Sequence, residues 1–399
     1  MPRSAGGRGE RADVVVIGAG VAGLVSAILM RRAGLDVLVL ERCTREQIET
    51  RPRAGLLGPG PVRVLERHGL ADGLRAAGSP HRNCEFRHGG RGFVVEYADY
   101  TGGLHHVVYP QQRLVRDLLA TYLDEGGTVE FAVADVRLGD LMDVAPTAAF
   151  VTAAGQPRQV RAHYLAGCDG FGGVSRASIP AGALRRTEQV RSRWAWLAVL
   201  AQVPPSTDKI IYAVSERGFA GHMLRDSTTS RFYLQVEAGS DPADWPAERI
   251  WAELRVRLGI DGWALAEGPL LEPPTVVSMD SIFFEPMRFG RLVLAGDAAR
   301  RVPPAAAKGA GLAIADGESL GLALPAAVRA GDDLPLLRYS EVCQRRAWLS
   351  QDASTKLLGL VHVDDADPYA RRIQDIRLER LRTSPVAAAA FAEDYVCPV

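Results

Sequence analysis

The first clear hydrophobic pattern of the chain is a short strand followed by an apolar helix. Val14–Ile17 is an uninterrupted β-branched run, which is typical of a strand buried on both faces. After a glycine-rich turn, apolar residues from Leu24 onward recur on one face of a helix, and Gly34 supplies a C-cap. A second apolar run ends at Glu41. The pattern therefore predicts a βαβ unit over residues 13–41.

The pattern changes in the middle of the chain and again near its end. Residues 183–275 alternate between short apolar stretches and turn residues, as expected for an antiparallel sheet. Residues 306–395 are predicted to be mainly helical, with a surface loop at 326–335. The strands expected in the middle segment are RWAWLAVLAQV, KIIYAV, FAGHMLRD and RFYLQVE.

The turn after the first strand carries glycines in a GxGxxG spacing. Gly18 makes the tight turn, Gly20 lets the backbone approach a pyrophosphate, and Gly23 lets the helix pack closely on the strand. The helix N-terminus offers unpaired N–H groups and a partial positive charge to the phosphates. Glu41 lies 18 residues after Gly23, where its carboxylate can accept hydrogen bonds from a ribose. These residues predict a dinucleotide-binding turn rather than a chance glycine turn.

Two later stretches favour FAD over NAD as the dinucleotide. Asp169 follows an apolar strand, and Gly296 and Asp297 follow another, with a proline turn and a long helix after them. The ribityl chain of FAD gives Asp297 a partner that NAD lacks. The helix that starts near Lys308 can direct its positive end at the flavin pyrimidine. Each motif alone is also compatible with an ordinary αβ turn. The FAD contacts expected in this part of the chain are Asp169, Gly296, Asp297, Lys308, Gly309, Ala310 and Gly311.

Composition and charge narrow the class of protein. The 399 residues carry 47 Lys and Arg and 47 Asp and Glu, which gives no support for nucleic acid or a membrane surface as a partner. The five cysteines form no CxxC pair, which argues against a disulfide framework or a zinc site and favours the cytoplasm. We expect no membrane span, because no apolar run reaches about 18 residues. The polar start of the chain predicts a disordered tip rather than a signal peptide.

Taken together, the motifs resemble the group A flavoprotein aromatic hydroxylases. The order and spacing of the 4-hydroxybenzoate 3-monooxygenase subfamily recur in RPRAGLLGPG, YPQQRLVRDL, GCDGFGGVSRASIP, RGFAGHMLRDSTTSRFYLQV, GRLVLAGDAARRVPPAAAKG and AEDYV. The resemblance implies an α/β fold with a Rossmann-like FAD-binding domain, an antiparallel-sheet substrate domain and a helical C-terminal part. The expected boundaries are 1–182 completed by 286–345 for the first, 183–285 for the second and 346–399 for the third.

The resemblance also implies a monooxygenase reaction cycle. Reduced nicotinamide gives hydride to FAD, O2 forms a C4a-hydroperoxyflavin, and one oxygen atom is transferred ortho to the phenolate of a small aromatic acid. Arg51 and Arg53 match family arginines in the loop beside the flavin, although both are also compatible with surface charges. Gln111 matches a glutamine that contacts FAD.

The choice between NADPH and NADH stays open. Only one GxGxxG is present, as in the family, which binds the nicotinamide cofactor transiently. A histidine and an arginine expected to contact NADPH are replaced here by Gly172 and Asp280. Arg42 and Arg45 can meet a 2′-phosphate, or they can be solvated surface charges, which is the simpler interpretation for Arg45.

A predicted hairpin carries the candidate carboxylate-binding residues. Strand alternation places Gly221, Met223 and Arg225 on one face. If the following turn centres on Thr229, Arg225 lies opposite Tyr233. From the residues alone, Arg225 is equally a buried ion-pair partner or a charge at the sheet edge. The resemblance implies that Arg225 binds the substrate carboxylate with help from Tyr233, and a guanidinium suits that task because two parallel N–H groups match a carboxylate.

Two tyrosines and one carbonyl are the candidate catalytic groups. The resemblance implies that Tyr212 hydrogen-bonds the substrate phenol, that Tyr395 continues a proton relay, and that the backbone carbonyl of Pro304 contacts the phenol. A free phenol titrates near 10, so the site must favour its ionised form through hydrogen bonds. Without the resemblance, core packing is the simpler interpretation of each tyrosine.

The chain departs from the subfamily at polar positions of the substrate site. Met223 replaces a serine, Ala305 a threonine and Gly311 an asparagine. Each lost hydroxyl partner weakens carboxylate binding by about 1 kcal/mol, and the two smaller replacements make room for a ring substituent. These departures favour a substituted substrate such as 3-amino-4-hydroxybenzoate over 4-hydroxybenzoate itself.

Two other kinds of flavoprotein are alternatives to an aromatic hydroxylase. A flavin reductase or dehydrogenase would never hydroxylate, and a flavin-binding sensor would need no substrate pocket. A metal site is not expected, because His105 and the adjacent His106 would point oppositely on a strand. His362 with Asp364 and Asp365 is more simply interpreted as a polar turn. Members of the family often form dimers, which leaves a homodimer open for this chain.

Overall fold

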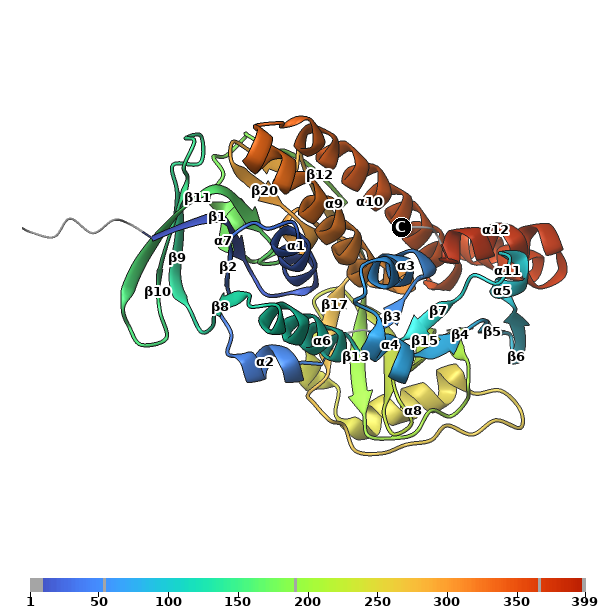
Figure 1. Cartoon of the computed structure of the whole chain (residues 1–399). Helices are drawn as coiled ribbons and strands as arrows, with labels where there is room; N and C mark the ends of the chain where they lie inside the picture. The colour runs from blue at the N-terminus through green and yellow to red at the C-terminus, as the bar shows by residue number, and fades with distance from the viewer. Residues whose placement is uncertain (1–9, 53–54, 190–191, 365–366, 397–399) are drawn as a thin grey trace, which may run out of the picture.

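The computed structural model describes residues 10–52, 55–189, 192–364 and 367–396 (Figure 1). The first strand, β1 (Glu10–Ile17), begins at the start of the described chain. The disordered tip that we predicted before this strand lies outside the described residues.

The larger sheet is the parallel sheet that the βαβ pattern predicts. Five of its strands run in the order β20-β11-β1-β2-β8, with parallel pairing throughout. β19 pairs antiparallel with β20, and an antiparallel extension of β9 and β10 joins β11. The bounds of these strands are β2 (Val37–Leu40), β8 (Thr128–Glu130), β9 (Ala134–Gly139), β10 (Thr147–Val151), β11 (Pro157–Gly167), β19 (Arg288–Phe289) and β20 (Leu292–Leu294).

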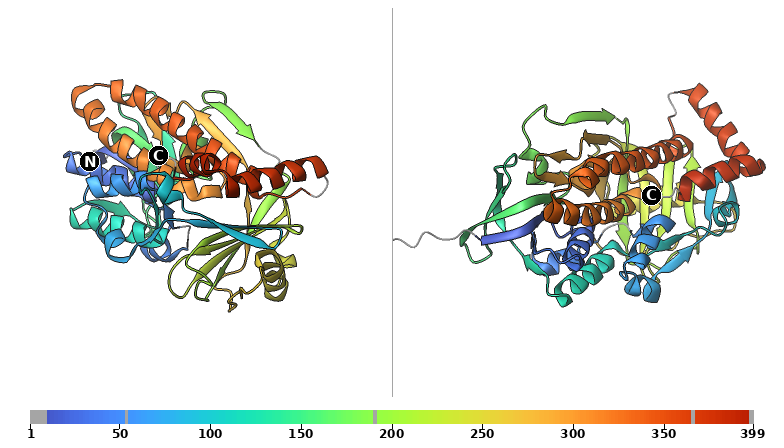
Figure 2. Two further views of the ribbon diagram at one scale, coloured as in Figure 1. Left: turned by 90° about the vertical axis from the view of Figure 1, so that its right-hand side faces the viewer. Right: turned by 45° about the horizontal axis from the view of Figure 1, so that its top comes forward.

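The helices beside this sheet pack closely on one another because small residues line the contacts between them. α1 (Val21–Arg32) lies against α9 (Lys308–Ala330), and α10 (Leu334–Val361) runs alongside α9 (Figure 2). A Cβ added at Gly317 would lie 2.7 Å from the Ala22 carbonyl oxygen, so the helices could not approach this closely with a larger residue there. Within the described residues α9 alone is long and apolar enough to span a membrane, and 67% of its apolar window is buried in the molecule, as in a core helix.

The second large sheet has the order β17-β13-β16-β15-β14-β5-β6 and is antiparallel except for β14 with β5. Its two faces bury different side chains. Ile211 and Phe232 face α8 (Ala247–Leu258), which Figure 1 shows below the strands, whereas Tyr212 and Phe219 face the opposite side with the C-terminal helices. The strands and C-terminal helices are β5 (Cys84–His88), β6 (Arg91–Val95), β13 (Trp194–Ala201), β14 (Ile210–Ser215), β15 (Gly218–Leu224), β16 (Ser230–Glu237), β17 (Thr275–Ser278), α11 (Pro368–Thr383) and α12 (Pro385–Val396).

Two small sheets and several short helices complete the fold. One small sheet pairs β12 with β18 and β18 with β21, and the other pairs β3 and β4 with β7. Their bounds are β12 (Arg185–Gln189), β18 (Ser281–Glu285), β21 (Arg300–Arg301), β3 (Leu56–Leu57), β4 (Ser79–His81) and β7 (His106–Val108). The remaining helices are α2 (Arg45–Thr50), α3 (Pro59–Arg67), α4 (Asp72–Ala77), α5 (Tyr97–Tyr100), α6 (Gln111–Asp124), α7 (Val174–Ala177) and the 3-10 turns Pro242–Asp244, Gly296–Ala298 and Ala305–Ala307.

The predicted fold class is confirmed, with local corrections. All four strands expected in the middle segment are present. β5 and β6 join their sheet from within residues 1–182, so the substrate-side sheet draws on more of the chain than the predicted domain 183–285. The loop expected at 326–335 is much shorter, because α9 runs to Ala330 and α10 begins at Leu334.

The predicted centre of the hairpin turn was wrong by two residues, which shifts the partner of Tyr233 by four residues. Tyr233 pairs with Gly221 and Leu224 pairs with Ser230, so the turn centres two residues before Thr229 and Arg225 does not lie opposite Tyr233. Side chains alternate with a period of two, so this shift keeps Arg225 and Tyr233 on the same face of the sheet.

Candidate active site

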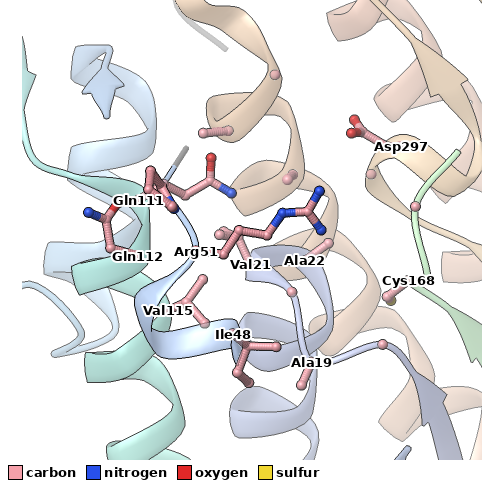
Figure 3. Close-up of a pocket in the computed structure, with 18 of the residues that line it drawn as sticks. Ala19, Val21, Ala22, Ile48, Arg51, Gln111, Gln112, Val115, Cys168 and Asp297 are labelled. Carbon is pink, nitrogen blue, oxygen red and sulfur yellow. The ribbon is translucent and has the colours of Figure 1, made fainter. Parts of the chain in front are cut away.

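A continuous cavity of about 1010 Å³ runs between the two large sheets. At one end it is bordered by the turn Gly18–Ala22, and at the other by Tyr212, Arg225 and Tyr233. Figure 3 shows Arg51 extending over the start of α1, with Asp297 at the far side of the cavity. Residues far apart in the sequence therefore line one continuous cavity.

The glycines of the first turn have distinct surroundings. Gly18 has φ +102°, and a Cβ there would lie 2.5 Å from the Cys168 carbonyl oxygen. A Cβ at Gly23 would lie 2.0 Å from the Gly18 carbonyl oxygen, so α1 packs directly on the turn. A Cβ at Gly20 would meet nothing within 4 Å, because this residue borders the open cavity. Gly20 is also the N-cap of α1, and no side chain caps the helix. The first N–H groups of α1 are therefore placed to bind a phosphate.

Glu41 is held rigidly at the end of β2. Its Oε2 accepts a hydrogen bond from the Ala19 N–H at 2.8 Å, and its Oε1 accepts one from the Cys43 N–H at 2.8 Å. The side chain is buried yet borders the cavity. A carboxylate oxygen can accept more than one hydrogen bond, so Glu41 retains the capacity to bind a ribose hydroxyl.

The opposite wall of this end is formed by two aspartate turns. Asp169 Oδ2 accepts a hydrogen bond from the Ser175 N–H at 2.8 Å, and its Oδ1 is buried without a hydrogen-bond partner among the described residues. Burial raises the pKa of Asp169. Gly296 has φ +60°, and its N–H donates to Asp316 Oδ2 at 2.8 Å, so a buried carboxylate fixes the turn that presents Asp297. Both Asp169 and Asp297 border the cavity.

The donor set fits FAD. A helix N-terminus, a glycine turn that leaves open space, a rigid carboxylate and an aspartate oxygen without a partner all meet at one end of the cavity. The predicted cofactor residues that also border the cavity are Arg42, Arg51, Gln111, Gly309 and Ala310.

Two predicted cofactor residues, Lys308 and Gly311, do not border the cavity. Lys308 lies outside the cavity lining, and its buried Nζ donates to the Tyr395 carbonyl oxygen at 2.6 Å. Gly311 faces α3, where a Cβ would lie 2.8 Å from Pro61. Arg53 lies outside the described residues. The first turn of α9 thus meets the cavity only through the residues between Lys308 and Gly311.

Two buried tyrosines meet at the substrate end. Tyr212 borders the cavity, and its hydroxyl lies 3.0 Å from that of Tyr395, which stands behind it on α12. Burial raises the pKa of Tyr212 and of Tyr395 above their ordinary value near 10. Both hydroxyls therefore keep their protons at neutral pH, and one donates to the other.

Arg225 is the cation of the substrate end. It is 6% exposed, and its Nη2 donates to Gln112 Oε1 at 2.7 Å. Burial, together with repulsion from Arg231, lowers the pKa of Arg225 to about 10, so the guanidinium stays charged at neutral pH. Tyr233 and Met223 line the same end of the cavity.

The predicted residues of the 302–306 turn are split between the cavity and the core. Pro304 borders the cavity, and its carbonyl accepts a hydrogen bond from the Ala307 N–H at 3.0 Å. Ala305 is fully buried outside the cavity lining, and its carbonyl accepts from Ser354 Oγ at 3.1 Å.

The sequence did not single out three residues that the structure adds to this end, namely Gln112, Trp196 and Arg231. The indole of Trp196 borders the cavity and donates through Nε1 to His362 Nε2 at 2.8 Å. Burial lowers the pKa of His362 to about 4, so the ring is the neutral acceptor that this bond needs. Strand alternation from Tyr233 would have indicated Arg231. No group of His, Cys, Asp and Glu in the described chain is suited to a metal ion.

Comparisons with known proteins agree with this geometry. A family model described as FAD binding domain matches residues 11–354. The chain belongs to the group A flavoprotein aromatic hydroxylases, which are FAD-dependent monooxygenases that typically take electrons from NAD(P)H.

Two relatives show the extent of the likeness. The p-hydroxybenzoate hydroxylase of Acinetobacter baylyi is 34% identical over 388 residues, which are 97% of this chain and 95% of that protein. Among solved structures, p-nitrophenol 4-monooxygenase PnpA from Pseudomonas putida DLL-E4 has a TM-score of 0.83 over 97% of this chain and 98% of that chain. Because only 20% of the residues are identical, the similarity to PnpA supports the fold and not the function.

Proposed function

We propose that this monooxygenase hydroxylates a 4-hydroxybenzoate-class acid at the carbon ortho to its phenol. The observation that carries the proposal is that Arg225 and Tyr212 border the same cavity as the turn Gly18–Ala22. An acid bound between these two side chains would lie in the same cavity as the cofactor.

The carboxylate end of the substrate is assigned to Arg225. A buried guanidinium forms strong paired hydrogen bonds with a carboxylate, and Gln112 holds the side chain in place from α6. Tyr233 lies on the same sheet face and adds a hydroxyl donor. The charged guanidinium attracts an aromatic acid more strongly than a neutral aromatic compound, so we expect the pocket to favour acids.

The phenol end is assigned to Tyr212, with Tyr395 behind it. Because both tyrosines are protonated at neutral pH, Tyr212 can donate to a phenolate oxygen while it accepts from Tyr395. In the reverse orientation Tyr212 accepts a hydrogen bond from the neutral phenol and donates its own proton to the hydroxyl of Tyr395. The pair therefore favours the ionised phenol, whose ortho carbon is the more reactive one toward an electrophilic oxygen.

When bound, FAD supplies the hydride acceptor and the activation of O2. The chain's part at this end is to hold the dinucleotide through the α1 N-terminus and Glu41, and to exclude water from the cavity. Arg51 lines the cavity beside α6, which supports its predicted place near the flavin.

Within this class we favour a ring-substituted acid such as 3-amino-4-hydroxybenzoate. The support comes from Met223, which lines the cavity where the subfamily has a serine and so makes this pocket differ from one that binds the parent acid. The argument from added room is not supported, because neither Ala305 nor Gly311 borders the cavity. The second candidate is 4-hydroxybenzoate itself, which is favoured by the 34% identity to p-hydroxybenzoate hydroxylase.

The test is O2 uptake and product mass with a panel of 4-hydroxylated benzoates. We expect substrate-dependent uptake, a product one oxygen atom heavier, and a substituted acid as the best substrate. Met223→Ser should lower KM about fivefold for these acids alike, because the restored hydroxyl meets the carboxylate that they share. If the wild-type enzyme clearly prefers 4-hydroxybenzoate, the proposal of a ring-substituted substrate is refuted. A panel without any hydroxylated product refutes the proposal and favours a flavin reductase or a flavin sensor. A cytoplasmic location and a homodimer stay predictions.

A further inference from the structure

Gln112, at the start of α6, borders the cavity together with the residues of the substrate end. The helix begins at Gln111, so the side chain of Gln112 projects from its first turn. Figure 3 shows Gln112 beside Gln111. Met223, Arg225 and Tyr233 line this end of the cavity from the hairpin of β15 and β16. Two separate elements, the hairpin and α6, therefore contribute side chains to the pocket.

The orientation of the Gln112 amide is fixed by Arg225. The Arg225 Nη2 donates to the Gln112 Oε1 at 2.7 Å. A guanidinium has only donors, so the amide oxygen must face it and the amide nitrogen must point elsewhere. In the part of the chain that the structure describes, no residue accepts a hydrogen bond from the Gln112 Nε2. The N–H groups of this nitrogen are therefore available to a ligand in the cavity.

The surroundings of Gln112 make its amide a good donor to an anion. A carbonyl oxygen that accepts from a cation polarises its own amide, and the effect is larger where the dielectric is low, as beside the buried Arg225. The N-cap residue of α6, Pro110, makes no side-chain hydrogen bond to the helix. The positive end of the helix dipole favours negative charge nearby. Hydrogen bonding and charge thus both favour an anionic group at this point.

A carboxylate bound at Arg225 has room for a further donor. A carboxylate offers about four lone-pair sites, and a guanidinium in paired contact uses about two of them. The Tyr233 hydroxyl can serve another site. Met223 adds none, because a thioether donates no hydrogen bond. The amide nitrogen of Gln112 is the neutral donor next to the guanidinium, and it can complete the set.

We propose that Gln112 binds the substrate carboxylate directly through Nε2 while its Oε1 holds Arg225. The proposal rests on the proposed function, which assigns the carboxylate to Arg225. The two side chains then act as one unit of donors around the carboxylate. Such a unit also discriminates against a carboxamide, because the NH2 group of a carboxamide would have to face at least one of these donors.

The test measures binding apart from turnover. Oxidised, FAD-loaded protein is titrated with 4-hydroxybenzoate and with 3-amino-4-hydroxybenzoate, and the change in flavin absorbance gives the dissociation constants. Gln112→Met keeps the length of the side chain and removes its polar atoms, so the dissociation constants should rise about tenfold. The matched control is Arg116→Met, which changes an exposed side chain of the same helix that faces Asp117. The control should bind both acids like the wild type.

A double-mutant cycle separates direct contact from positioning of Arg225. The change Gln112→Met is repeated in an Arg225→Ala background, where Gln112 no longer has an arginine to hold. If Nε2 meets the carboxylate, the dissociation constant should still rise about threefold in this background. If Gln112 acts only through Arg225, the second change has no effect there, and direct contact is overturned. FAD content and the unfolding temperature show that each variant is folded.

Gln112→Glu provides a second variant if Gln112→Met does not fold. It keeps the acceptor for Arg225 and replaces the donor by a charged oxygen. The dissociation constants of both acids should rise about a hundredfold, because a carboxylate then faces a carboxylate. The dissociation constant of 4-hydroxybenzamide should change less than threefold, because its NH2 group can donate to the new carboxylate. Equal changes for the acids and the amide overturn the contact.

Binding and hydroxylation are separate readouts, so this proposal and the proposed function can fail separately. Unchanged dissociation constants in Gln112→Met overturn the contact, even if the wild type hydroxylates aromatic acids. Weaker binding in Gln112→Met that persists in the Arg225→Ala background supports the contact, even if no aromatic acid is hydroxylated. Acid binding that does not change in Arg225→Ala overturns both the contact and the assigned pocket.

Discussion

The two ends of the cavity use different parts of the chain to meet their ligands. At the cofactor end, the backbone of Gly18 and Gly20 and the N-terminus of α1 form the surface, and side chains such as Glu41 are tied to that backbone. At the substrate end, side chains reach in from separate elements, with Tyr212 on the sheet and Tyr395 on the last helix.

This difference separates what the fold requires from what the substrate requires. A backbone site tolerates few changes, because an added Cβ at Gly18 collides with the chain itself. A side-chain site can change one residue, as at Met223, without disturbing the strand that carries it. We therefore expect a change that collides with the backbone at the cofactor end to affect folding and FAD binding together. A change in a side chain that meets the substrate should affect catalysis more than folding.

The largest effect is expected at Gly18. Gly18→Ala forces a side chain into φ +102° and 2.5 Å from the Cys168 carbonyl, which should cost about 4 kcal/mol or more of stability and abolish FAD binding. Gly20→Ala is the matched control, because its Cβ meets only open space and its φ of −78° suits alanine. Gly20→Ala should keep the wild-type unfolding temperature as apoprotein but bind FAD more weakly. If Gly18→Ala and Gly20→Ala lose the same stability as apoproteins, the two glycines do not have the distinct roles assigned to them.

The contrast between the backbone surface at the cofactor end and the side chains at the substrate end explains how much of the site could be predicted from the sequence. The glycine spacing and the apolar strands are local signals, so the cofactor turn at Gly18–Gly23 and the strand face that carries Arg225 were both predictable. The pairing of Arg225 was not, because its partner Gln112 lies on a helix more than a hundred residues away. Lys308 was misplaced for a related reason: nothing local indicates that its side chain turns to the Tyr395 carbonyl. Such long-range pairings depend on how the two sheets and the C-terminal helices come together.

Arg225 provides the next largest effect and the sharpest contrast with the first. Arg225→Ala removes a charge-assisted contact to the carboxylate, so KM for aromatic acids should rise about 100-fold, which is about 2.7 kcal/mol. FAD content should not change, because Arg225 lies at the far end of the cavity. The control is Arg217→Ala, which removes an exposed arginine of the same sheet region that pairs with Glu253. A change in KM of less than twofold in Arg225→Ala would remove the assigned role.

Acid should weaken the substrate end through His362. Its pKa is lowered from 6.5 to about 4 in the folded protein because of burial, so the unfolded chain binds the proton more readily between these values. The stability that the neutral ring contributes is full above pH 6.5 and is lost as the pH falls toward 4, by about 2 kcal/mol at pH 5.

His362→Gln tests this, because glutamine can still accept the hydrogen bond from Trp196 but does not titrate. Urea unfolding should show that the variant loses about 2 kcal/mol less than the wild type between pH 7 and pH 5. If the free energy of unfolding depends on pH in the same way in His362→Gln and in the wild type, protonation of His362 does not affect stability in this range.

The smallest effect, and the most specific to chemistry, is expected at the tyrosine pair. Tyr212→Phe removes the hydroxyl that faces the phenol, so less of the bound substrate is ionised, and the hydroxylated product per NAD(P)H consumed should fall about tenfold. Flavin reduction should continue, and the missing equivalents should appear as hydrogen peroxide. Tyr233→Phe is the matched control, because Tyr233 lines the same end without bonding to Tyr395, and we expect it to raise KM while product and NAD(P)H consumption stay coupled. Wild-type coupling in Tyr212→Phe would mean that the phenol loses its proton by another route and that the tyrosine pair serves packing alone.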